Sequence, residues 1–168
     1  MNSSDAAVPA ADRQVFIERT FDAPRELVFQ AWTDPAILER WYAPHGCTIV
    51  IQEYDFREGG TIRTEIRSPD GHACRCRGTF RRIVVPERIV FDLGIVNEQG
   101  EPAEPVSLGM DPDWPRTTTI DVAFEEQGGR TRLMLRQDVS ESLAKRTGAY
   151  PSWLQMFDRL DGVLATGE

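Results

Sequence analysis

The chain has 168 residues, of which 40% are hydrophobic and 27% are charged, and its formal net charge is −8. These proportions are those of an ordinary globular domain rather than a disordered or fibrous chain. A chain of this length buries about two-thirds of its unfolded surface as one domain, so it needs no disulfide or metal in order to fold. The acidic balance argues against a nucleic-acid-binding protein, because phosphate binding requires a basic face.

Residues 1–12 are mostly small and polar, and we expect them to form a flexible tail before a single domain over residues 13–168. The sequence has three cysteines, no apolar signal-peptide core near Met1 and no apolar run of membrane-spanning length. We therefore expect a cytoplasmic protein with reduced cysteines and no insertion into a membrane.

The chain is expected to open with a strand and two helices. Residues 14–21 alternate apolar and polar side chains, which is the period of a half-buried strand. Apolar residues then recur at spacings of three and four between Leu27 and Trp41, with a break at Pro35. This pattern predicts two short amphipathic helices in succession.

Both helices carry a similar start signal. Asp22 and Asp34 each stand where a carboxylate can accept hydrogen bonds from the free N–H groups of a first helical turn, that is, at an N-cap. Pro24 and Pro35 follow them, and a proline suits the first helical position because its φ is fixed and it has no N–H. We therefore predict that both aspartates cap their helices.

Most of the remaining chain shows the short period of strands divided by turn residues. The strands are predicted over residues 47–56, 61–67, 72–85, 89–93, 117–125 and 131–137. The segment 94–116 contains four prolines and little periodicity, which indicates a long loop. It forms either a rim or lid, or a plain surface excursion between strands.

A last helix is predicted over residues 151–165, with a wide apolar stripe that needs an apolar surface to bury against. The alternating strands supply that surface. The fold class is therefore α+β: a curved antiparallel sheet, with elements in the order β-α-α-β-β-β-β-β-β-α, closed on one side by helices.

Charged residues on the predicted strands are assigned to the outer face of the sheet. Alternation places Arg75, Arg77 and Arg81 on one solvated face. Arg63 and Glu65 alternate with isoleucines, so we expect them to be ordinary surface residues. A shift of one residue in register would turn them inward as a charged pair facing a polar group of a ligand.

Five motifs follow one another in an order that is quite specific to one family. They are Ala31-Trp32-Thr33-Asp34-Pro35, Trp41-Tyr42-Ala43-Pro44, Asp55-Phe56-Arg57-Glu58-Gly59-Gly60, Pro86-Glu87-Arg88-Ile89-Val90-Phe91 and Gly129-Arg130-Thr131-Arg132-Leu133. In this ordered set the chain resembles a bacterial single-domain member of the family of heat-shock-protein-ninety ATPase activator homologues. That family belongs to the steroidogenic-acute-regulatory-related (START-like), helix-grip superfamily of lipid-transfer and polyketide-cyclase proteins. The resemblance covers residues 14–165.

The resemblance implies a bent sheet that grips the long C-terminal helix, with an elongated cavity between them. We expect this cavity to bind a small, mainly hydrophobic ligand, in a setting of stress response or detoxification. The candidate ligand-binding residues are Trp41, Tyr54, Phe80, Phe91, Trp153, Met156, Phe157 and Leu160. Each of them would serve equally well as an ordinary core residue. Members of the family often pair into homodimers.

Two other functions stay open. A cyclase-like enzyme would need proton-carrying groups in the cavity, and the candidates are His45, His72, Tyr54, Asp55 and Glu65. Both histidines stand at turns, so we expect them to be exposed, and we favour a binding protein over an enzyme. Regulation of a chaperone ATPase is disfavoured, because in the activator the chaperone contact involves an additional domain for which this chain has no room.

A zinc site is a further alternative. His72, Cys74 and Cys76 alternate on one predicted strand, and His45 and Cys47 flank the start of another. Residues two apart on a strand hold their sulfurs apart, however, and small buried cysteines explain the pattern equally well. We expect neither a metal nor another cofactor.

Overall fold

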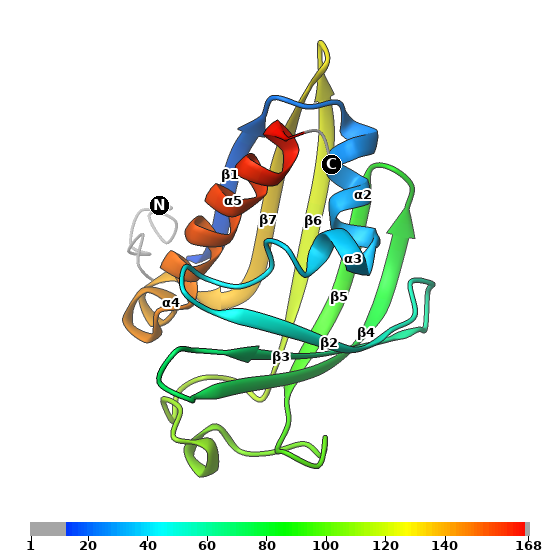
Figure 1. Cartoon of the computed structure of the whole chain (residues 1–168). Coiled ribbons are helices and arrows are strands. Elements are labelled where there is room, and N and C mark those ends of the chain that lie inside the picture. The colour runs from blue at the N-terminus through cyan, green and yellow to red at the C-terminus, as the bar shows by residue number, and fades with distance from the viewer. Residues whose placement is uncertain (1–12, 167–168) are drawn as a thin grey trace, which may run out of the picture.

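The computed structural model describes residues 13–166, in which a strongly curved antiparallel sheet folds around helices (Figure 1). The seven strands lie in the order β1-β7-β6-β5-β4-β3-β2. Their bounds are β1 Gln14–Phe21, β2 Thr48–Tyr54, β3 Thr61–Arg67, β4 Ala73–Val84, β5 Arg88–Ile95, β6 Thr117–Gln127 and β7 Arg130–Ser140. The tail predicted over residues 1–12 lies outside the described residues.

The helices cover the inner, concave face of the sheet. Their bounds are α2 Arg25–Thr33, α3 Pro35–Leu38, α4 Glu141–Thr147 and α5 Ala149–Ala165. The long helix α5 lies over β1 and β7, whereas α2 and α3 lie over the strands toward the other side of the sheet (Figure 1). This is the predicted α+β helix-grip arrangement. Within the described residues, no helix is long and apolar enough to cross a membrane.

Helix α4, over residues 141–147, is not predicted by the sequence pattern. Ser140 caps this helix, because its hydroxyl accepts a hydrogen bond from the backbone N–H of Leu143 at 3.2 Å. The helix ends at Gly148, whose φ of 90° is readily adopted only by glycine. Both signals are present in the sequence, but the helix between them is only seven residues long.

The two predicted N-caps behave differently. The Asp34 carboxylate accepts a hydrogen bond from the backbone N–H of Ala36 at 3.0 Å, which confirms the prediction for α3. The prediction for Asp22 is wrong, because Pro24 itself occupies the N-cap of α2 and no side chain caps that helix. The cause is spacing. Proline directly follows Asp34, but a residue separates Asp22 from Pro24, so Asp22 lies too far ahead of the first turn.

Strand β3 has the predicted bounds, but Glu65 is not an ordinary surface residue. Its side chain points to the outer face and yet the residue is only 6% exposed. Its two carboxylate oxygens lie 2.6 Å from Nε of Arg67 and 3.2 Å from Nε of Arg75. The hydrogen bond from Arg67 is the main reason why the pKa of this carboxyl is lowered. Neighbouring arginines therefore cover it, which alternation alone does not reveal.

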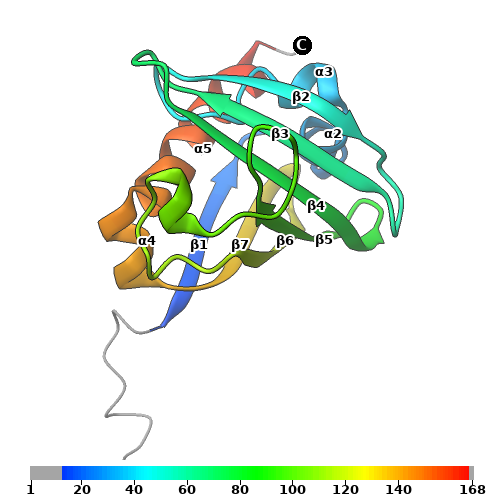
Figure 2. The same ribbon diagram turned by 90° about the horizontal axis from the view of Figure 1, so that it is seen from below.

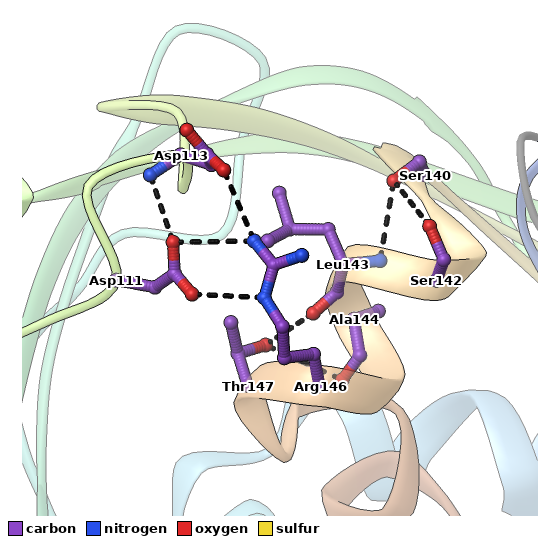
Figure 3. A network of polar contacts seen from close by, with 8 residues as sticks. All are labelled: Asp111, Asp113, Ser140, Ser142, Leu143, Ala144, Arg146 and Thr147. Carbon is purple, nitrogen blue, oxygen red and sulfur yellow. Dashed lines mark hydrogen bonds and ion pairs between the residues drawn. The ribbon is translucent and has the colours of Figure 1, made fainter.

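The segment 96–116 links β5 to β6, and its far part is fastened to α4 (Figure 3). The guanidinium group of Arg146 donates from Nε to Asp111 at 3.0 Å and from Nη2 to Asp113 at 3.1 Å. A short 3₁₀ helix, Pro105–Leu108, interrupts the segment. The segment is thus held by α4 as well as by the strands that it joins.

We expect Asp34→Ala to lower the free energy of unfolding by about 1 kcal/mol, because it removes the capping hydrogen bond of α3. Asp22→Ala is the matched control. The Asp22 carboxylate lies 3.7 Å from Nε of Arg130 in an exposed pair, so its removal should change the stability by less than about 0.5 kcal/mol. Urea denaturation followed by circular dichroism measures both. Equal losses in the two variants would contradict the assignment of the caps.

Candidate ligand-binding site

A cluster of aromatic rings fills the space between the helices and the sheet, and Trp32 of α2 lies at its centre. Its ring centre is 4.9 Å from that of Trp41 and 6.2 Å from that of Tyr42. The rings of Trp153 and Phe157 on α5 both lie 6.3 Å from it. One side chain therefore connects α2, the segment after α3, and α5.

A small enclosed void lies beside this cluster, on the inner face of the sheet between the helix pair and strands β2 to β5. Its volume is about 10 Å³, room for about one water molecule. The void is lined by Trp32, Leu38, Tyr42, Tyr54, Ile62, Phe80, Ile89 and Phe91. Its wall is almost entirely apolar and is built from α2, α3 and four strands, and α5 contributes no residue to it.

The structure divides the predicted ligand-binding residues into two groups. Tyr54, Phe80 and Phe91 line the void. The other five are buried in the core and do not line it. They are Trp41, Trp153, Met156, Phe157 and Leu160.

Sequence reasoning missed Trp32 and Tyr42 as lining residues. Both stand in the motifs that carry the family resemblance, so the signal for them was present. The lining residues Leu38, Ile62 and Ile89 have no distinguishing signal, since each stands in an ordinary apolar pattern.

The indole nitrogen of Trp32 is the unusual polar atom of this site. It is buried and has no hydrogen-bond partner among the described residues. The other two tryptophans of the cluster are satisfied, since Trp41 Nε1 donates to the carbonyl of Ala31 and Trp153 Nε1 donates to Gln137, each at 3.0 Å. A buried N–H without an acceptor is unfavourable, so this atom is a natural point for recognition of a ligand.

Two tyrosines add neutral hydroxyl groups. Burial raises the pKa of Tyr42, with smaller contributions from Cys76, Tyr54 and Cys74. Burial also raises the pKa of Tyr54, with a contribution from Asp34. The Tyr54 hydroxyl donates to the backbone carbonyl of Trp32. Both phenols therefore stay protonated near neutral pH and act as hydrogen-bonding groups rather than as bases.

The remaining candidates for acid–base catalysis are scattered. His45 and His72 are exposed, as predicted. Asp55 is half-buried and its carboxylate lies 2.8 Å from Nε of Arg57. Glu65 lies on the outer face, as described above. The void lining includes none of these four residues.

Cys74 and Cys76 lie two residues apart on β4 and interact with each other. A hydrogen bond with Cys76 lowers the pKa of the Cys74 thiol to about 7, and the same bond together with burial raises the pKa of Cys76. All three cysteines, including Cys47, are free thiols, and Cys74 is exposed. Among the described residues, no group of three or more His, Cys, Asp or Glu could hold a metal ion.

We expect the rate of alkylation of Cys74 by iodoacetamide to rise with pH with a midpoint of about 7, because only the thiolate reacts. Replacement of the partner, Cys76→Ala, removes the hydrogen bond and should move the midpoint up toward the ordinary value of about 8.5. Mass spectrometry of the alkylated peptide measures the rate at each pH. The same midpoint in both proteins would show that Cys76 does not tune Cys74.

Solved structures with this fold come from several bacteria. The solution structure of a protein from Arthrobacter aurescens superimposes with a TM-score of 0.79 at 24% identity, covering 95% of this chain and 90% of that one. A crystal structure of a protein from Mycobacterium smegmatis gives 0.76 at 21% identity, covering 93% of each chain. The AHSA1 protein from Silicibacter pomeroyi gives 0.73 at 18% identity, covering 93% of this chain and 100% of that one.

These likenesses establish the fold. No curated protein matches the sequence. The model of one protein family matches residues 22–165, which is most of the chain. The chain therefore belongs to the family described as Activator of Hsp90 ATPase homolog 1-like protein.

Proposed function

We propose that this protein binds a small, mainly hydrophobic molecule on the inner face of its curved sheet, at the void between the helix pair and β2 to β5. Aromatic and aliphatic side chains line the void, as in most small-molecule sites. A role in stress response or detoxification and a homodimeric state stay predictions from the family resemblance, and a cytoplasmic location stays a prediction from the sequence.

The observation that carries the proposal is the unpartnered Nε1–H of Trp32, a residue that lines this void. A ligand with an apolar body and one hydrogen-bond acceptor would satisfy that donor while burying its remaining surface against the aromatic wall. Tyr42, whose phenol stays neutral, lines the same void. The expected ligand therefore has few polar atoms and no charge at its buried end.

A ligand larger than one water molecule requires the void to expand. Its two walls differ in how firmly they are held. The strands contribute Ile62 and Phe80 from the hydrogen-bonded sheet, in which Ile62 is paired with Gly78 and Phe80 with Phe91. The opposite wall contributes Leu38 from a helix of four residues and Tyr42 from the irregular segment after it. We therefore expect the pocket to open on the side of α3, where fewer backbone hydrogen bonds have to change.

A neutral fluorophore, N-phenyl-1-naphthylamine, tests the proposal because it is hydrophobic and carries no charge. We expect saturable binding at one site with quenching of tryptophan emission. Ile62→Phe should weaken it by about tenfold, because the added ring fills the void. Val106→Phe is the control, since the same kind of enlargement at a residue that is 66% exposed should leave binding unchanged.

Thermal melts of all three proteins establish that the variants are folded. Lack of saturable binding in the wild type, or equal binding in wild type and a folded Ile62→Phe, would overturn the proposal. Native mass spectrometry of gently purified protein then identifies any molecule that the site retains.

A further inference from the structure

A second pocket lies on the opposite, outer face of the sheet and is separate from the aromatic void. Its volume is about 500 Å³, within the range of small-molecule sites. Strands β3 to β6 form its floor and the turn 96–102 forms part of its wall. In the view from below, the segment that contains this turn crosses in front of β3 and β4, on the side turned away from α5 (Figure 2).

Strand register places Arg63, which does not itself line the pocket, beside Arg77, which does. Arg63 of β3 is paired with Arg77 of β4, and Arg77 is paired in turn with Gly94 of β5. Gly94 is paired with Thr117 of β6. Directly paired residues project to the same face, so the two guanidinium groups are neighbours there. Gly94 has no side chain, and this leaves a hollow between Arg77 and Thr117.

The other charged residues of the pocket already have partners. The carboxylate of Asp92 is engaged by Arg81 and accepts a hydrogen bond from the hydroxyl of Thr119 at 3.0 Å. Arg116 lies 3.2 Å from Glu104. These pairs leave no carboxylate of the pocket lining free to neutralise the two paired arginines. Outside the lining, Glu53 of β2 is paired in register with Arg63 on its other side, but no ion pair joins the two within residues 13–166.

Arg63 and Arg77 themselves have no ion pair within residues 13–166. The Nε atom of Arg63 is buried and has no hydrogen-bond partner in that part of the chain. The turn passes directly over this guanidinium, since a Cβ added at Gly100 would lie 2.6 Å from Nη2 of Arg63. Asn97 fixes the turn by accepting hydrogen bonds from the backbone N–H groups of Gln99 and Glu101 at 2.9 and 3.0 Å.

We propose that this outer pocket binds a small dianionic molecule, a phosphate ester or a dicarboxylate, through Arg77, which lines it, and the neighbouring Arg63. Like charges placed directly opposite on a sheet repel each other, and an oxyanion between them removes that repulsion. The guanidinium fork matches the oxygen spacing of carboxylate and phosphate. The hydroxyls of Thr79 and Thr117 line the same space and can donate to further oxygens. The net charge of the chain is −8, so this cationic pair is not part of a generally basic surface.

Titration of the ¹⁵N-labelled full chain with inorganic pyrophosphate, and separately with succinate, tests this site by NMR. We expect saturable shifts of the backbone amides of Thr79, Gly94 and Gly100, which line the pocket. Sodium chloride at the same ionic strength should cause no such saturation. Tighter binding of pyrophosphate would indicate a phosphate ester as the natural ligand, and tighter binding of succinate would indicate a dicarboxylate.

Arg77→Gln and Arg63→Gln should each weaken the binding by about tenfold or more, because each removes a charged donor. Arg82→Gln is the matched control, an exposed arginine of the same strand that does not line the pocket. Arg77 is exposed, so its variant keeps the fold even if the Arg63 variant does not. Absence of saturable binding of both anions, or binding that Arg77→Gln and Arg82→Gln affect equally, would overturn the proposal.

Discussion

The packing of Trp32 against rings from several elements is the contact on which the inner half of this fold depends. Its ring meets those of Trp41 and Tyr42 after α3, of Phe124 on β6, and of Trp153 on α5. A strongly curved sheet leaves a deep space that short aliphatic side chains fill poorly, and large rings fill it with few rotatable bonds. The same packing holds the Trp32 Nε1–H in a place where the described residues offer it no acceptor.

Arg159 of α5 holds the segment that links α3 to β2. Its Nη1 donates to the carbonyl of Ala43 at 2.7 Å and to that of Cys47 at 3.3 Å, and its Nη2 donates to the carbonyl of Arg40 at 3.1 Å. The side chain of Gln155 adds a contact by accepting from the backbone N–H of His45 at 3.0 Å. These bonds from α5 hold the segment between α3 and β2. Any widening of the void toward α3 must stretch these bonds or move α5 with the segment.

Most of the fold was predictable because local patterns and the final structure agree. Strands β1 and β3 have their predicted bounds, since strict alternation is bounded by turn residues such as Gly60 and Gly71. The failures have physical causes. Asp22 is a residue type that caps helices, but it lies one residue too far from α2 to do so. Glu65 faces outward as predicted, but neighbouring arginines cover it. A single sequence shows a residue's face, but not what other parts of the chain place over it.

The candidate site was less predictable for the same reason. The sequence does not distinguish aromatic residues such as Phe157 and Phe80. Only the folded structure shows that Phe80 lines the void and that Phe157 does not. That decision follows from strand register. Phe80 and Ile62 point to the aromatic interior, whereas Arg63 and Arg77 stand on the other face.

The same strand register therefore sets the side chains on both faces of the sheet. A slip of one residue of β3 against β4 would bring Arg63 into the apolar interior, where an unpaired charge is very unfavourable, and would expose the apolar side chains of β3. The hydrophobic wall of the inner void thus fixes the register that places the two guanidinium groups side by side. Their mutual repulsion persists because the buried apolar partners on the opposite face outweigh it. Apolar packing on the inner face of the sheet therefore holds the two arginines in place on the outer face.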